Sequence, residues 1–321
     1  MGEAGEAEVL RLVLAGVGPS RAELGPGDDA AVIAVPTGRI VATTDTLVHG
    51  PDFRLAWSSG RDLGWKSAAV NLADVAAMGA RPVALLVALA MPDETPLGFV
   101  RELAEGLRDA CAELAPGCAV EGGDLTVSDT LTIAVTALGV LDGPAVSRSG
   151  ARDGDVVALA GEAGAAGRGL RVLFERFRDA AGAPVPVDAS ALSAAERADL
   201  AAQLRPRPPI GAGPVAAEAG AHAMMDVSDG LVLDATRMAE ASGVTIAIDS
   251  GALGHDPAAA LTGGEDHGLL AAFAPDTTLP AGFRPIGQVR ARASAAVLVD
   301  GTPYAGRGGW DPYADWDAAR G

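Results

Sequence analysis

Five short segments of the sequence combine aspartate with glycine, serine, threonine or asparagine, a composition suited to binding hard cations. They are Gly27-Asp28-Asp29, Thr43-Thr44-Asp45, Asn71-Leu72-Ala73-Asp74, Gly122-Gly123-Asp124 and Asp226-Val227-Ser228-Asp229-Gly230. Any one of them fits the ordinary use of aspartate in turns and helix caps, but five are too many for caps alone. Mg²⁺ prefers oxygen ligands and is usually held, together with substrate phosphates, by one or two carboxylates per ion. The set therefore indicates several Mg²⁺ ions bound with a polyphosphate.

The overall charge supports this interpretation. The 321 residues carry a formal net charge of -18, and Lys66 is the only lysine, so the electrostatic footprint of a nucleic-acid-binding protein is missing. An acidic protein repels phosphates unless cations lie between them. Bridging Mg²⁺ ions would remove this repulsion and would stabilise a transferring phosphoryl group.

Several other kinds of protein are excluded by the sequence. The longest apolar run, Pro82–Met91, is far shorter than the ~20 residues that span a bilayer. With no targeting signal at the N-terminus, we expect a cytoplasmic protein. A Walker A loop requires glycine directly before its lysine, whereas Trp65 precedes Lys66 here. No nucleophile paired with a base is recognisable.

The first half of the chain, which carries most of these aspartates, has the pattern of a mixed α/β domain. Helical spacing covers residues 3–15 and 62–78, with Gly79 as a helix cap, and a further helix is expected over 96–114. Strands are expected at 30–35, 39–44, 83–90 and 131–140, and the segment 121–124 is expected to be a loop.

The pattern restarts after Ser147, which places a domain boundary between domains 1–147 and 148–321. A strand at 156–160 is followed by the glycine-rich stretch Gly161–Gly169, which opens a helix. Glycine spacing alone is a weak sign of a nucleotide site, so we interpret this stretch as a structural turn.

Seven motifs resemble those of thiamine-monophosphate kinases and occur in the family's order. They are Gly-Asp-Asp-Ala-Ala-Val at 27–32, Thr-Thr-Asp-Thr-Leu-Val at 43–48, Asn-Leu-Ala-Asp-Val-Ala-Ala-Met-Gly-Ala at 71–80, Gly-Gly-Asp at 122–124, Arg-Ser-Gly-Ala at 148–151, Asp-Val-Ser-Asp-Gly-Leu at 226–231 and Gly-Gly-Glu-Asp at 263–266. The resemblance implies an α/β (α+β) protein with a two-domain PurM-like fold. Its N-terminal mixed α/β domain would form a homodimer and bind ATP with the C-terminal α/β domain. It also implies transfer of a phosphoryl group from ATP to thiamine monophosphate, giving thiamine diphosphate.

Site residues follow from the resemblance position by position. The implied Mg²⁺ ligands are Asp29, Thr43, Thr44, Asp45, Asp74, Asp124, Asp226 and Asp229. The implied ATP contacts are Gly123, Asp124, Arg148 and Ser228. Glu265 and Trp310 match substrate positions, and an aromatic ring suits the flat, partly cationic thiamine rings.

Two departures from the family pattern affect the substrate site. Where the family often has a histidine, this chain has Asp52, so we expect Asp52 to face the substrate. His49 is an alternative that fits a solvated loop equally well. The final motif is also altered, since Asp311-Pro312-Tyr313 replaces the family's usual Asp-His-Phe.

Because the acceptor phosphate is already ionised near neutral pH, no general base is expected. Direct in-line transfer then depends on positioning and electrostatic stabilisation. Two alternatives stay open: a related enzyme that phosphorylates another small acceptor, or a nucleotide or metal sensor without turnover.

Overall fold

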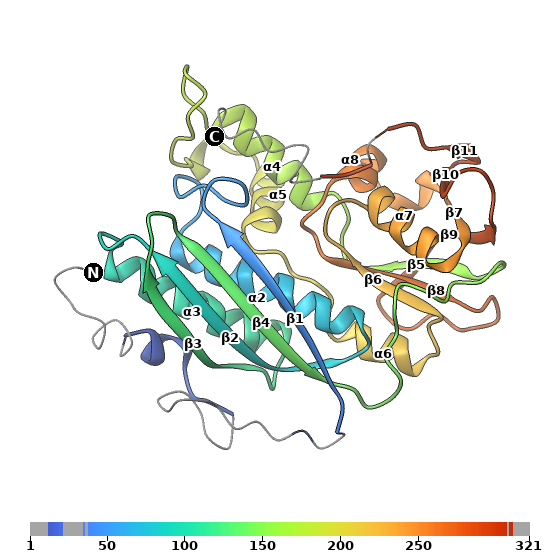
Figure 1. Ribbon diagram of the computed structural model, residues 1–321. Coiled ribbons are helices and arrows are strands. Elements are labelled where there is room, and N and C mark those ends of the chain that lie inside the picture. The colour runs from blue at the N-terminus through green and yellow to red at the C-terminus, as the bar shows by residue number, and fades with distance from the viewer. Residues whose placement is uncertain (1–11, 22–34, 36–37, 307, 311–321) are drawn as a thin grey trace.

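The computed structural model describes residues 12–21, 35, 38–306 and 308–310. The first half of the chain forms a four-stranded sheet in the order β1-β4-β2-β3 (Figure 1). Its strands are β1 Ile40–Val48, β2 Arg81–Met91, β3 Ala119–Val127 and β4 Thr132–Val140. Strand β4 pairs antiparallel with β1 and β2, whereas β2 and β3 are parallel.

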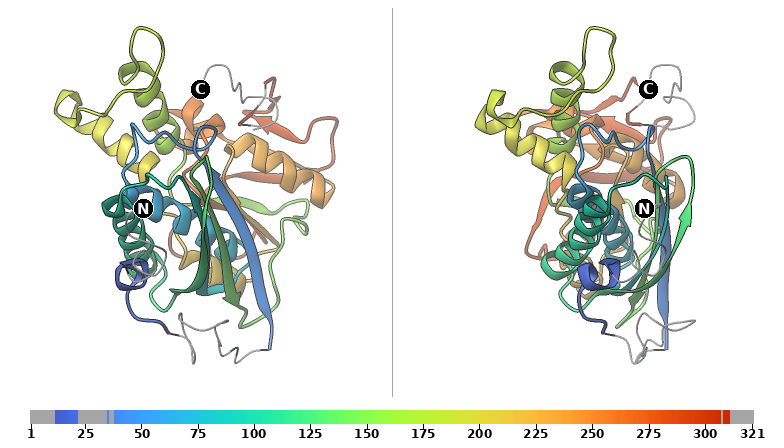
Figure 2. Two further views of the ribbon diagram at one scale, coloured as in Figure 1. Left: turned by 60° about the vertical axis from the view of Figure 1, so that its left-hand side comes forward. Right: turned by 90° about the vertical axis from the view of Figure 1, so that its left-hand side faces the viewer.

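Two long helices, α2 (Gly60–Ala77) and α3 (Leu97–Leu114), lie against one face of this sheet (Figures 1 and 2). Helix α2 begins with a capping box in which Ser59 and Asp62 satisfy each other's backbone N–H groups. It ends where Gly79 adopts a φ of 75°, the left-handed conformation of a helix C-terminus. The predicted helix at 62–78 is therefore confirmed, together with its glycine cap.

Glycines allow α2 and α3 to pack closely. A Cβ on Gly64 would lie 2.0 Å from the carbonyl oxygen of Leu103, and one on Gly106 would lie 2.2 Å from that of Arg61. Side chains at these positions would push the helices apart, so the spacing of the two helices depends on hydrogen at each α-carbon.

The second half forms a seven-stranded sheet in the order β11-β10-β7-β9-β5-β8-β6. Its strands are β5 Val156–Ala160, β6 Ala223–Val227, β7 Val244–Ile248, β8 Gly268–Phe273, β9 Phe283–Ala291, β10 Val297–Val299 and β11 Thr302–Pro303. Its helices are α4 Ala165–Arg176, α5 Ala194–Leu204, α6 Ala212–Glu218, α7 Leu231–Ser242 and α8 Pro257–Thr262, with short 3₁₀ turns at Ala189–Ala191 and Ser250–Leu253. The predicted strand at 156–160 is β5, and the glycine-rich stretch leads into α4.

The two sheets share a hydrophobic core. Helix α2 packs against β1, β2 and β4 of its own sheet and also against β6 and β8 of the other. One continuous cluster of buried side chains runs from Leu72 and Ile133 to Met224 and Phe273. Because α2 is covered on nearly all sides, it lacks the polar stripe of a surface helix.

One expectation about local structure was wrong. Residues 121–124 form part of the continuous strand β3 instead of a loop. Gly123 lies so close to β2 that a Cβ would be 2.0 Å from the carbonyl oxygen of Val87, so the paired glycines serve strand packing here. The strand expected at 30–35 and most of the helix expected at 3–15 lie outside the described residues.

None of the helices in the described ranges is long and apolar enough to cross a membrane.

Candidate active site

Four predicted ligands come together where the two sheets meet. Asp45 lies on β1, Asp74 on α2, Asp226 at the end of β6, and Asp229 in the turn before α7. Asp45 and Asp74 each lie within electrostatic range of Asp226 on the other sheet. Segments about 150 residues apart in the chain therefore build one carboxylate cluster.

Neighbouring side chains orient the first half of this cluster. The Thr43 hydroxyl donates to Asp74 at 2.8 Å. The backbone N–H of Asp45 donates at 3.0 Å to the amide oxygen of Asn71, one turn before Asp74 on α2. The Thr-Thr-Asp and Asn-x-x-Asp motifs thus lie side by side, as a shared cation site requires.

The cluster is electrostatically strained without cations. Burial, followed by the charges of Asp226 and Asp45, raises the pKa of Asp74 to about 7. Burial also raises the pKa of Asp45, with further contributions from Asp226 and Asp229. Bound cations would relieve this repulsion and stabilise the ionised carboxylates.

The donor set fits Mg²⁺ chemically, because it consists of carboxylate and hydroxyl oxygens. In the part of the chain that the structure describes, no group of three or more His, Cys, Asp or Glu side chains is arranged to hold an ion by itself. Mg²⁺ characteristically keeps waters and binds substrate phosphates beside one or two carboxylates. The arrangement therefore fits ions that are held jointly by the protein and a polyphosphate.

A buried carboxylate that the sequence did not single out anchors Asp229. Asp234 on α7 accepts the backbone N–H groups of Asp229 at 3.1 Å and Gly230 at 3.3 Å. The Arg237 guanidinium donates to both Asp229 and Asp234 at 2.6 Å. Burial raises the pKa of Asp234 to about 6. This network fixes the turn that carries Ser228 and Asp229.

The loop of residues 263–267 ties the site together through three consecutive side chains. Glu265 forms an ion pair with Lys66 of α2. Asp266 accepts backbone N–H groups from Gly164 at 2.6 Å and Ala166 at 2.9 Å, at the start of α4. His267 contacts Asp226 at 3.0 Å through Nδ1.

The backbone of this loop is strained. Glu265 has a φ of 73° and His267 a φ of 53°, a region that residues other than glycine seldom adopt. Such conformations are often found at functional sites, where the surrounding structure enforces them.

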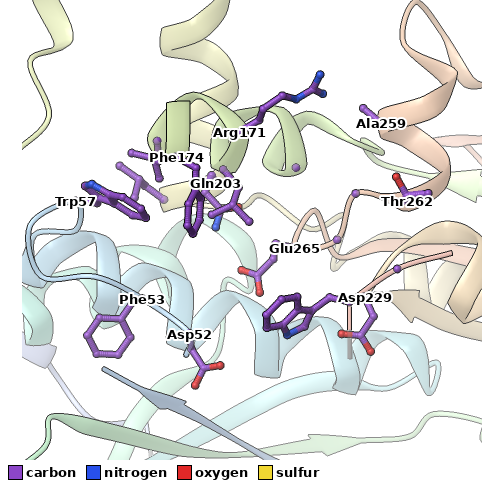
Figure 3. A pocket seen from close by; sticks show the side chains of 18 of the residues that line it. Asp52, Phe53, Trp57, Arg171, Phe174, Gln203, Asp229, Ala259, Thr262 and Glu265 are labelled. Atoms are coloured by element: carbon purple, nitrogen blue, oxygen red, sulfur yellow. The ribbon is translucent and has the colours of Figure 1, made fainter. Parts of the chain in front are cut away.

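A cavity of about 910 Å³ opens beside the carboxylate cluster (Figure 3). The residues predicted to bind substrate, Asp52, Glu265 and Trp310, all line it, together with Ser228 and Asp229. Figure 3 shows Asp52 and Glu265 on different segments of the chain that border the cavity. The structure therefore brings the predicted substrate residues to one cavity.

The far end of the cavity is aromatic. Trp57 and Phe174 meet edge to face with ring centroids 5.1 Å apart, and the Arg178 guanidinium lies 5.2 Å from the Phe174 ring. Flat rings of this kind suit an aromatic ligand. Thus the cavity has a charged end near Asp229 and an aromatic end on α4.

Asp52 and His49 were the two candidates for the substrate-facing residue of one loop. Asp52 lines the cavity and His49 does not. The Asp52 carboxylate accepts the backbone N–H of Val48 at 2.7 Å, and burial raises its pKa. His49 is exposed and lies against Phe53, with ring centroids 5.6 Å apart.

Not every predicted ligand joins the cluster. Thr44 points to the opposite face of β1 from Thr43, because side chains alternate along a strand, and donates to the carbonyl oxygen of Val135. Gly123 and Asp124 lie on β3, three strands from β1, which corresponds to about 14 Å at the usual strand spacing. Asp29 lies outside the described residues.

Arg148 lies at the other end of α7 from Asp229. Its carbonyl oxygen accepts from Ser242, the last residue of that 12-residue helix, and a helix of this length spans about 18 Å. The predicted roles of Arg148, Gly123, Asp124 and Thr44 remain predictions.

Comparison with known proteins first defines the class. The family model "AIR synthase related protein, N-terminal domain" matches residues 27–141, and "AIR synthase related protein, C-terminal domain" matches residues 152–278. The structure accordingly has the two-domain, mixed α/β AIR synthase-related fold.

Individual relatives narrow the class to one family. Thiamine-monophosphate kinase from Mycobacterium tuberculosis is 40% identical over 330 residues, covering 98% of this chain and 93% of its own. The thiamine-monophosphate kinase structure from Stenotrophomonas maltophilia is 32% identical with a TM-score of 0.77, covering 92% of this chain and 96% of its own. A structure described as AaThiL complexed with AMPPCP and TMP is 30% identical with a TM-score of 0.75, covering 96% and 97%. The chain belongs to the thiamine-monophosphate kinase family.

Proposed function

We propose that this protein is a kinase that transfers the γ-phosphoryl group of ATP to thiamine monophosphate, producing thiamine diphosphate and ADP. The observation that carries the proposal is the cavity beside the carboxylate cluster. Asp52, Glu265 and Trp310 line this cavity, and Asp229 belongs to both the cavity and the cluster. An acceptor in the cavity would present its phosphate to a nucleotide held at the cluster.

In the proposed reaction, an oxygen of the acceptor phosphate attacks the γ-phosphorus in line while the bond to the ADP oxygen breaks. No side chain needs to remove a proton, because the acceptor is already ionised. The protein would align the two phosphates and exclude water, which are the main contributions that positioning can make.

Mg²⁺ would be held by Asp45, Asp74, Asp226 and Asp229 with oxygens of the ATP phosphates, and Thr43 would orient Asp74. When bound, Mg²⁺ neutralises phosphate charge and stabilises the transferring group. By resemblance we also propose Asp29, Thr43, Thr44 and Asp124 as ligands, and Gly123, Asp124, Arg148 and Ser228 as ATP contacts. Ser228 is the one of these ATP residues that lines the cavity.

We further propose that the protein works as a cytoplasmic homodimer. The face of the first sheet opposite α2 and α3 has no helix against it among the described residues (Figure 2). Small and hydroxyl side chains such as Thr46, Ala88 and Ala134 lie on that face. Such a face is suited to packing against a second copy.

The test is product formation from ATP and Mg²⁺ with thiamine monophosphate, with thiamine, or with no acceptor. Thiamine diphosphate should appear only with the monophosphate. Asp74→Asn and Asp124→Asn should each lower kcat/KM by about 100-fold or more, the size expected when electrostatic stabilisation of phosphoryl transfer is lost. The matched control is Asp276→Asn, at an exposed aspartate, which should leave turnover unchanged.

ATP binding without any diphosphate would contradict the proposal. Turnover with another phosphorylated acceptor would then indicate a related kinase, and saturable ATP binding without turnover would indicate a sensor. Undiminished activity in Asp74→Asn would refute the role of the cluster.

A further inference from the structure

The only lysine of the chain lies under the proposed substrate site. Lys66, on α2, keeps 6% of its side-chain exposure, lines the cavity and forms an ion pair with Glu265. A second partner comes from α5. In the amide orientation that satisfies both ends, Gln203 accepts from Lys66 Nζ at 3.1 Å and donates to the carbonyl oxygen of Ala166 at 3.1 Å.

The two members of this pair differ in exposure. Lys66 lies in the interior, whereas the Glu265 side chain keeps 40% of its exposure and extends into the cavity (Figure 3). The Lys66 ammonium therefore contacts Glu265 from the protein interior, and the rest of the carboxylate is available to a ligand in the cavity. An ion pair that served only the fold would have no need to present its anion to a cavity.

Several contacts hold Glu265 in this position. Its backbone N–H donates to the carbonyl oxygen of Ser228 at 2.7 Å, and its φ of 73° is strained. Burial opposes ionisation of Glu265, but Lys66 and then His267 outweigh it, so the pKa of the carboxyl stays below its ordinary value. Both the charge and the direction of this carboxylate are thus determined before any ligand arrives.

Stability alone is a poor explanation for Lys66. An ion pair with a buried member contributes little net stability, because taking the Lys66 ammonium out of water costs about as much as its attraction to Glu265 contributes. Preorganising a charged group is a different benefit, because the free energy of binding is then not reduced by the cost of ordering that group.

We propose that Lys66 is a positioning residue that holds the Glu265 carboxylate at the cavity wall to receive the heteroaromatic part of the acceptor, which carries an amino group on one ring and a positive charge on the other. The inference rests on the proposed function, because it takes the occupant of the cavity to be thiamine monophosphate. Lys66 acts through Glu265 and does not touch the reacting phosphates. Its loss should therefore affect acceptor binding far more than the chemical step.

The first experiment uses the fact that one lysine gives one signal. Protein labelled with ¹³C at the lysine Cε is titrated with thiamine monophosphate, with Mg²⁺ and a non-hydrolysable ATP analogue present, and binding is measured in parallel by calorimetry. The Lys66 resonance should shift with the same midpoint as the calorimetric isotherm. In Glu265→Gln, binding should weaken about tenfold or more, as expected for loss of a charge-assisted contact, and the shift should be lost.

The second experiment separates positioning from a structural role. Lys66→Met should raise KM for thiamine monophosphate about tenfold or more while kcat and KM for ATP change less than about threefold. Lys66→Arg should recover part of the loss. Arg205→Met is the matched control, since it removes an exposed partner of Asp62 outside the cavity, and should leave all three parameters unchanged.

Each outcome decides the matter. If wild-type protein binds the acceptor but the Lys66 signal does not move, or if Lys66→Met binds as tightly as wild type, the inference is wrong while the proposed function survives. If Lys66→Met does not fold, the titration of the wild type still decides. If the wild type neither binds nor phosphorylates thiamine monophosphate, the proposed function and this role fall together.

Discussion

Asp74 is a residue at which the two halves of the site act on each other. On helix α2, it accepts a hydrogen bond from Thr43 of the first sheet and is repelled by Asp226 of the second. Burial and like charge raise its pKa to about 7, so ionising it opposes folding in the absence of cations. The same feature prepares the site for cations, because a ligand that neutralises the repulsion is bound more tightly.

The pH dependence of stability should reveal this strain. Because the folded-state pKa of Asp74 is raised above its unfolded value of 3.8, its contribution to stability is present below that value and is lost as the pH rises through about 7. Metal-free protein should therefore melt at a higher temperature at pH 5.5 than at pH 8. In Asp74→Asn this difference should shrink, and Mg²⁺ with ATP should raise the melting temperature of the wild type at pH 8.

Scanning calorimetry of the two proteins at both pH values measures this effect. Asp276→Asn should behave as wild type, because that carboxylate is exposed. A wild-type pH profile that matches the Asp74→Asn profile would show that Asp74 is not strained.

At the residue scale, sequence reasoning named the aspartates of the cluster but not the residues that support them. Four of the predicted ligands, Asp45, Asp74, Asp226 and Asp229, lie near one another. Their role as ligands stays a prediction. Lys66 entered only as the single lysine of the chain and in the exclusion of a Walker A loop, and Asp234 and Arg237 were not singled out. A charged residue within a helix looks the same in sequence whether it faces water or a buried carboxylate, so only the tertiary contact separates the two cases.

The close packing of α2 and α3 in the first domain depends on glycines that have no side chain. On α2, Gly64 faces the carbonyl oxygen of Leu103, and a Cβ would lie only 2.0 Å away. Close approach of α2 and α3 in turn determines where Asp74 and Lys66 lie relative to the sheets. Element spacing and site geometry are therefore coupled.

Two glycine-to-alanine substitutions test this coupling with opposite expected signs. Gly64→Ala should lower the free energy of unfolding by about 2 kcal/mol or more, because the new methyl group overlaps backbone of the neighbouring helix. Gly98→Ala, on α3 with no atom within 4 Å of the added Cβ, should raise it by about 0.5 kcal/mol through better helix propensity. Urea denaturation measures both, and equal effects would contradict the packing argument.

At the element scale, periodicity predicted the long helices and β5 almost to the residue. It failed at residues 121–124, since a segment rich in glycine and carboxylates has the composition of a turn. Here the neighbouring backbone of β2 decides the conformation, and Gly123 is required because a side chain would meet the carbonyl oxygen of Val87. Pairing of this kind joins distant segments and has no local signal.

For the whole molecule, the uncovered face of the first sheet predicts self-association. Ala134 lies on the inner strand β4, on the face that no helix of the described residues covers. Ala134→Glu would place a charge within the proposed interface and should convert a dimer to a monomer. Val215→Glu, at an exposed position on α6, is the control.

Sedimentation velocity of the wild type and both variants decides the question. A wild-type monomer at tens of micromolar would contradict the dimer proposal, and unchanged association in Ala134→Glu would place the interface elsewhere.

The domain boundary at 147 remains a prediction, because chain composition alone does not show where contacts between the halves end.

The shared core around α2 limits which recombinants between related genes can fold. The helix is built by the first half of the sequence, yet it buries side chains against β6 and β8 of the second. A recombination event between two relatives near residue 147 would join halves whose facing surfaces had diverged separately. Such a hybrid would survive only if the residues of α2 and their partners on both strands remained compatible, so selection should act on these halves as a single heritable unit.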